Sequence, residues 1–286
     1  MISLDAATFL LQWATGGLLF LWVTTRRREV GIGYGWLMRG TYGILAAIGV
    51  VAGVRYGAEP GREIAGIGVV AATTAALVVS VVRRKAGVAG ERERVERRSA
   101  RITAMTGIDR QADGPRDDVP EFPPVLDLIA PAIGVVGLLF AAGAAAQGDA
   151  SYAVSLFRVL AGAAFLGAVT DAMLLGHWYL VQPGLARGPL LELVRWTGIT
   201  WPFEVVAMLL PTGMLSVLAG DIDDGYGGLL GWFWIACALG TIVLVVVTRA
   251  ALKERYYSAV MAATGLLYLA ILTAFGTDLV ARAVLA

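Results

Sequence analysis

Eight separate runs of about 20 mostly apolar residues follow one another along the chain, and they limit the possible folds more than any other feature. The runs cover residues 7–25, 36–55, 64–82, 125–146, 152–180, 199–219, 227–248 and 257–280. Only 16% of the residues are charged, whereas a soluble domain has about 25%. Each run is long enough to cross the hydrocarbon core of a bilayer as a helix. The sequence therefore predicts an all-α, polytopic transmembrane helix bundle of about eight spans.

Basic residues gather in three of the loops between these runs. The largest group is ten Lys and Arg residues between Arg83 and Arg116, after the third run. Smaller groups follow the first and the seventh run: Arg26, Arg27, Arg28, Arg249, Lys253 and Arg255. Loops rich in Lys and Arg tend to stay in the cytoplasm. We therefore expect a multi-pass protein of the cell membrane, with these loops cytoplasmic and both termini outside, as an even number of spans requires.

The chain divides into three segments by composition. Residues 1–82 hold the first three predicted helices, 83–124 form a charged cytoplasmic connector, and 125–286 hold the remaining five helices. Alternating charges over 91–98 suit a solvated helix, and the Pro, Gly and Asp residues of 111–124 are typical of an extended linker. The segment is too short for a catalytic domain, so we interpret it as a connector. A docking surface for a cytoplasmic partner and contact with anionic lipid are the alternatives.

A second feature on the same side of the membrane lies near 187–197. Pro183 and Gly184 are expected to end the fifth helix just before it. The stretch contains Glu192 and Arg195 and is too short to cross a bilayer. It therefore predicts a short amphipathic helix lying along the membrane surface.

Several classes of function lack the residues they need. The single cysteine, Cys237, forms no intrachain disulfide and no Cys-based metal site, and a single histidine excludes bis-histidine haem ligation. We find no nucleotide-binding glycine loop, no zinc spacing and no Ser or Cys nucleophile with a second histidine. The net charge of +1 gives nucleic-acid binding no support. We therefore expect neither an enzyme acting alone nor a cofactor bound by this chain alone, a quinone excepted.

The remaining functional signal lies in polar residues inside or beside the apolar runs. An ionisable group within a membrane costs roughly 2.5–3.5 kcal/mol on insertion, so such groups are functional candidates. We predict one polar pocket near the inner membrane surface, lined by Asp171, His177, Tyr179, Glu192, Arg195, Trp201 and Glu204. Asp171 and His177 do not share a helix face, so their convergence requires the Pro183 break or a neighbouring helix. A carboxylate at Glu204 near a helix start, favoured by the helix dipole alone, is the alternative.

Three charged residues lie toward the other side of the predicted bundle. Arg158 follows the start of the fifth run by six residues, about 9 Å, and either snorkels to the outer interface or pairs with an embedded acid or a ligand. Asp278 and Arg282 are four residues apart near the end of the last run. This spacing predicts a helical ion pair that fixes the helix end.

Three functions fit these observations. An aromatic, titratable pocket with an arginine suits a quinone, so our first hypothesis is a non-catalytic integral membrane subunit of a respiratory or redox complex, surrounded by lipid and other subunits. The second is a proton-coupled secondary transporter of a small solute that uses the same residues with Arg158. The third is a structural or assembly subunit, in which each polar residue satisfies a helix end.

The topology also resembles that of a known family. Eight spans, outside termini, the chain length and a last helix that closes with Asp278 and Arg282 resemble the quinol-oxidising membrane anchors of the dimethyl sulfoxide reductase and polysulfide reductase type. The resemblance implies an all-helical bundle without its own metal, which passes quinol electrons to an iron–sulfur partner. This chain departs from that pattern because its densest predicted polar cluster is cytoplasmic, whereas such anchors usually dock their partner on the outer face.

Overall fold

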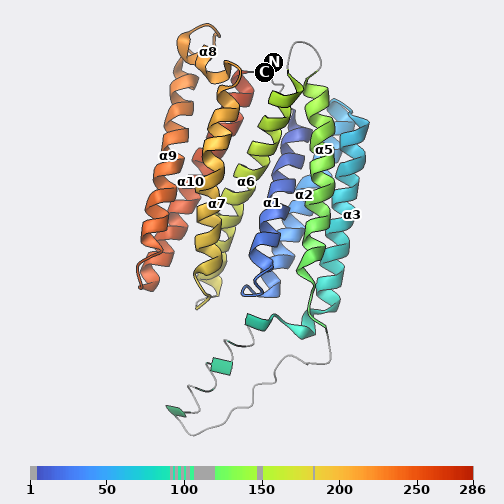
Figure 1. Ribbon diagram of the computed structural model, residues 1–286, viewed down its shortest axis with the longest axis vertical. Coiled ribbons are helices and arrows are strands. Elements are labelled where there is room, and N and C mark those ends of the chain that lie inside the picture. Colours follow the sequence, from blue (N-terminus) through green and yellow to red (C-terminus); the bar gives the residue numbers. More distant parts are fainter. Residues whose placement is uncertain are drawn as a thin grey trace.

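The computed structural model describes residues 5–90, 93, 96–97, 100, 104–105, 120–146, 151–182 and 184–285, and these residues contain helices and no strand (Figure 1). The α-helices are α1 (Ala6–Thr25), α2 (Ile32–Tyr56), α3 (Pro60–Val82), α5 (Ile129–Ala145), α6 (Tyr152–Val181), α7 (Gly188–Leu209), α8 (Gly213–Ala219), α9 (Leu229–Ala251) and α10 (Tyr257–Val284). Two short 3₁₀ helices, η1 (Arg84–Ala86) and η2 (Pro124–Leu128), flank the connector.

The described helices confirm the predicted all-helical membrane bundle. Seven of them, with η2 counted as the start of the fourth span, are long and apolar enough to cross a bilayer. The eighth candidate is the pair α7 and α8, which together pass the same test but are bent by 63°. α1 begins and α10 ends at one end of the bundle, which we call the termini end, and η1 and η2 lie at the opposite connector end (Figure 1). Which end faces the cytoplasm stays a prediction.

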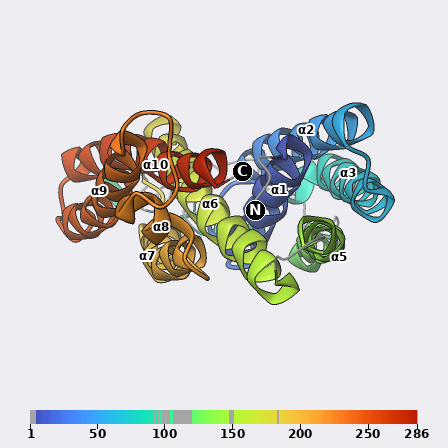
Figure 2. The same cartoon turned by 90° about the horizontal axis from the view of Figure 1, so that it is seen from above.

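The helices form two groups with α6 between them. α1, α2, α3 and α5 pack together on one side, and α7 to α10 pack together on the other (Figure 2). α6 runs diagonally between the groups and contacts α1 and α5 on one side and α7 and α10 on the other. Any site shared by the two groups therefore lies along α6.

Close packing of α1 on α6 depends on small residues. A Cβ atom on Gly16 would lie 1.7 Å from the carbonyl oxygen of Ala163, and one on Gly167 would lie 2.2 Å from the backbone of Gly16. Small residues allow this approach in a bilayer, where van der Waals packing supplies much of the drive for helix association. The two backbones therefore meet directly.

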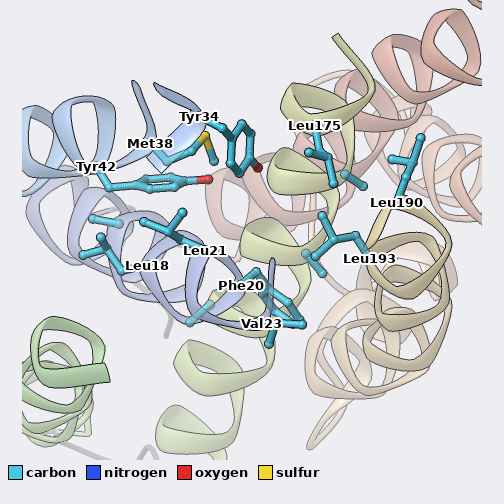
Figure 3. Close-up of a cluster of buried hydrophobic side chains, with 14 of the residues drawn as sticks. Leu18, Phe20, Leu21, Val23, Tyr34, Met38, Tyr42, Leu175, Leu190 and Leu193 are labelled. Atoms are coloured by element: carbon cyan, nitrogen blue, oxygen red, sulfur yellow. The ribbon is translucent and has the colours of Figure 1, made fainter. Parts of the chain in front are cut away.

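Buried side chains of several helices fill the interior around this contact. Tyr34, Met38 and Tyr42 of α2 are fully buried, and the two tyrosine hydroxyls point toward α6 (Figure 3). Large apolar side chains also cover the outside, including Ile44, Val51, Val54, Val243, Val246 and Leu272. An apolar exterior of this kind suits contact with lipid.

The predicted surface helix near 187–197 is not a separate element. This stretch is the first half of α7, which continues without a break through Pro202 to Leu209. Leu190, Leu193 and Val194 are fully buried in the bundle core, so the apolar face of the stretch packs on protein instead of lying on the membrane surface. Within the connector, the linker predicted over 111–124 lies outside the described residues up to 119, and the helix predicted over 91–98 is described only at 93, 96 and 97.

Candidate functional site

The seven residues predicted to line one pocket are spread over the bundle instead. Asp171 is fully buried and faces α2, where its carboxylate accepts a hydrogen bond from the Tyr42 hydroxyl. His177 lies on another face of α6, with its Nδ1 atom 3.0 Å from the hydroxyl of Tyr268 on α10. Tyr179 donates its hydroxyl hydrogen to the carbonyl of Ala186.

The four α7 residues of that prediction also have separate surroundings. Glu192 pairs at the connector end with Arg26 and Arg27, whose nitrogens lie 2.5 and 2.7 Å from its carboxylate oxygens. Arg195 is exposed. Trp201 donates its indole N–H to the carbonyl of Ala238 on α9, 2.9 Å away. Glu204 lies toward the termini end, far along α7 from Glu192, so one pocket does not unite these groups.

Glu204 instead belongs to a different group of buried polar side chains, which four helices bring together. We call this group the central polar cluster; its members are Gln12, Arg158, Glu204, Asp278 and Arg282, from α1, α6, α7 and α10, and all are buried. Each charged member lies within about seven residues, or 11 Å, of the helix end on the termini side. The cluster therefore lies at one depth in that half of the bundle.

Arg282 joins the two helix groups within this cluster. Its Nε atom donates to Asp278 Oδ2 at 2.8 Å, and its Nη2 atom donates to Gln12 Oε1 at 2.8 Å. Gly162 of α6 leaves the space for this contact, since a Cβ atom there would lie 2.2 Å from Gln12 Nε2. The predicted pair of Asp278 and Arg282 forms, and both side chains are buried between helices.

The two acids of the central polar cluster are close to one another and short of donors. The carboxyl groups of Glu204 and Asp278 are near enough to influence one another, and Arg282 acts on both. With both acids ionised, no described donor reaches Glu204 Oε1, Glu204 Oε2 or Asp278 Oδ1. An unpaired buried carboxylate is very unfavourable. A proton held between the two groups would supply the missing donor.

Arg158 binds the backbone at the bend between α7 and α8. Its Nε atom donates to the carbonyl of Ala207 at 3.1 Å, and its Nη2 atom donates to the carbonyl of Leu210. In a continuous helix the Ala207 carbonyl would accept from the nitrogen of Pro211, but proline has no N–H. The guanidinium therefore replaces the donor that Pro211 removes at Ala207, and it also binds the Leu210 carbonyl at the bend. Arg158 is buried, but none of the described ion pairs joins it to an acid, and whether it lies within the membrane stays a prediction.

A cavity of about 560 Å³ opens beside the cluster at the termini end. Its charged lining residues are Asp5, Glu59, Arg62, Arg158 and Arg282, and its other walls include Ser155, Val159 and several alanines. Volumes of this size are typical of small-ligand sites. Because Arg158 and Arg282 belong to both, the cavity and the central polar cluster form one continuous polar region.

Three other ion pairs fasten the first helix group. At the connector end, Arg39 Nε and Nη2 lie 2.7 and 2.8 Å from the two Asp127 oxygens. At the termini end, Arg62 pairs with Asp5 and, at 2.6 Å, with Glu63. Arg62 and Glu63 are neighbours on α3, whereas the other two pairs join separate elements. We interpret them as structural.

Sequence reasoning missed Gln12, Arg39, Tyr42 and Asp127. Arg39 lies inside the second apolar run, so the rule that selected Arg158 as an embedded charge also applies to it. Gln12 is neutral and has no comparable signal. In the described part of the chain, no three His, Cys, Asp or Glu side chains are close enough to hold a metal ion together.

Comparisons of the chain with protein-family models, with curated proteins and with solved structures found no match. The resemblance to quinol-oxidising anchors therefore stays a prediction from topology, and the function is argued from the site.

Proposed function

We propose that the chain is a proton-coupled membrane transporter of a small solute, in which Glu204 and Asp278 together bind and release one proton. The observation that carries the proposal is this pair of fully buried, neighbouring carboxyl groups, three of whose oxygens lack a hydrogen-bond donor. Arg282 compensates one negative charge through Asp278. The other cation of the cluster, Arg158, donates to backbone carbonyls and forms no described hydrogen bond with Glu204, so we infer that the pair holds a proton at rest.

The surroundings of the pair support transport over a purely structural role. Broken membrane helices place free backbone groups at the substrate sites of many transporters. Here α7 carries Glu204 and ends in such a break, five residues further on. The break lies next to the cavity, because Arg158 contacts both. A proton and a solute would thus share one compartment.

The redox-subunit hypothesis has less support from the geometry. Both hypotheses relied on the predicted pocket, whose residues face different helices. The transport hypothesis also used Arg158, which lies with Glu204 in the central polar cluster. We therefore prefer the transport hypothesis, in which the solute enters from the termini end.

Difference infrared spectroscopy of the reconstituted protein tests for the proton. A protonated carboxylic acid has a C=O stretching band that a carboxylate lacks. We expect this band in the wild type at neutral pH, and we expect Glu204→Gln to remove it. The control is Glu254→Gln, which changes an exposed acid in the α9–α10 turn and should leave the band unchanged. If Glu204→Gln and the wild type have the same carboxylic acid bands, the pair carries no proton and the proposal is wrong.

A further inference from the structure

The cavity at the termini end is lined by charged side chains of both signs. Its two carboxylates, Asp5 and Glu59, lie at the start of α1 and in the turn before α3, and Arg62 pairs with Asp5. Arg158 and Arg282 line the cavity from α6 and α10, where no described lining residue is acidic. We call this α6–α10 side of the cavity the positive side.

The two arginines on the positive side differ in how their charge is compensated. Arg282 forms an ion pair with Asp278 at 2.8 Å. Arg158 is nine-tenths buried, yet none of the described ion pairs includes it, and the hydrogen bonds found for it go to backbone carbonyls. Carbonyl oxygens satisfy N–H donors but leave a full positive charge uncompensated. A buried charge of this kind usually has an ionic partner.

From these observations we infer that the cavity binds a small organic carboxylate, whose carboxyl group pairs with Arg158. A guanidinium offers several N–H donors in one plane and suits a carboxylate well. The alanines and Val159 of the walls would contact the carbon skeleton, and Ser155 offers a hydroxyl group. This inference rests on the proposed function, since it names the class of solute that the transporter would carry.

Binding of the anion would also favour binding of the proton. An anion beside Arg158 and Arg282 competes with Asp278 for positive charge, so the acid pair holds its proton more tightly. The groups that act on Glu204 are Asp278 and Arg282 on α10. Arg158 on α6 and Asp5 before α1 act on Arg282, and Cys237 of α9 lies next to Gly276 of α10. Coupling of this kind is reciprocal, so protonation of the pair strengthens anion binding by the same factor.

Isothermal titration calorimetry of the purified full chain in lipid nanodiscs tests the inference, with lactate as the probe and lactamide as its uncharged counterpart. We expect lactate to bind and lactamide not to bind. Arg158→Gln should weaken lactate binding by about 10- to 100-fold, the range for a lost charge-assisted hydrogen bond. The control Arg255→Gln, at an exposed arginine of the α9–α10 turn, should bind lactate as the wild type does.

Ala145→Phe provides a second test, because Arg158→Gln also removes the donors at the α7–α8 bend. Ala145 lines the cavity at the end of α5, so a phenyl ring there should fill the space and weaken lactate binding without a change of charge. Equal binding of lactate and lactamide overturns the inference, as does absence of lactate binding to the wild type. Unchanged lactate binding in Ala145→Phe overturns it too.

Proteoliposomes that contain a pH-sensitive dye separate this inference from the proposed function. If lactate binds but brings no proton into the vesicles, the transport proposal fails and the binding site stands. If lactamide drives proton entry while lactate does not bind, the transport proposal stands and the carboxylate inference fails. Lactate-driven proton entry that Glu204→Gln abolishes, while lactate binding persists, supports both.

Discussion

The buried ion pair at the connector end offers the sharpest test of how this bundle is held together. We predict that Arg39→Met lowers the free energy of unfolding by about 3–5 kcal/mol, because it leaves the Asp127 carboxylate buried without its cation. Both side chains are at most 3% exposed, and two hydrogen bonds of 2.7 and 2.8 Å join them. The Thr25 hydroxyl would remain as a donor to Asp127, at 3.0 Å.

The double variant Arg39→Met with Asp127→Leu separates the charge from the packing. It removes both ions, so no buried charge is left uncompensated. We expect its free energy of unfolding to fall by less than that of either single variant, since replacing a complete buried pair with apolar residues is often nearly neutral. The two substitutions should therefore be strongly non-additive, as contacting residues usually are.

Reversible unfolding in mixed micelles, followed by circular dichroism, measures these free energies. Arg97→Met serves as the control, because Arg97 forms an exposed helical pair with Glu93 at 3.2 Å and should change the free energy by no more than about 0.5 kcal/mol. The reasoning is wrong if Arg39→Met behaves like this control. It is also wrong if the losses of the two single variants simply add in the double variant.

Two further predictions concern the α1–α6 contact and the loop before α9. Gly16→Ala should lower the free energy of unfolding by about 1–3 kcal/mol or more, because its Cβ atom would overlap the carbonyl of Ala163. The control Gly40→Ala adds a Cβ atom that meets no atom within 4 Å, so it should not destabilise the fold. Equal stability of the two variants would refute the packing argument. Backbone hydrogen bonds, above all the one from Gly228, lower the pKa of the Asp224 carboxyl group. The ionised group should therefore stabilise the loop fully when the pH is above the ordinary pKa of Asp. That stabilisation should be lost as the pH falls through the lowered pKa. An NMR titration of the Asp224 carboxyl carbon with a midpoint at or above the ordinary value would contradict this.

The positions of the membrane helices could be predicted because hydropathy is a local property of the chain. Each predicted apolar run corresponds to a helix or a helix pair, and the boundaries agree closely for most of them. The stretch near 187–197 was misread because its charges resemble those of a surface helix. Glu192 is instead paired with Arg26 and Arg27 of another loop, which the local sequence does not reveal.

The candidate site was harder to predict because it depends on the rotation and order of the helices. Asp171 and His177 are close in sequence but face α2 and α10, so nearness along α6 did not bring them together. Arg158, Glu204 and Asp278 are far apart in sequence, yet each lies five or six residues from a helix end on the termini side. Depths counted from the predicted runs do not unite them, because Glu204 lies near the inner end of the run 199–219, whereas Arg158 and Asp278 lie near the outer ends of theirs. Which faces they occupy required the structure.

The Arg158 guanidinium both binds the α7–α8 bend and lines the cavity, so the two interactions compete for it. Its donors hold the free carbonyls of Ala207 and Leu210, and the same charge borders the open cavity. An occupant that draws the guanidinium toward itself would withdraw those donors and leave the bend held less firmly. The bend between α7 and α8, in the sixth crossing, would thereby respond to whether the cavity is occupied.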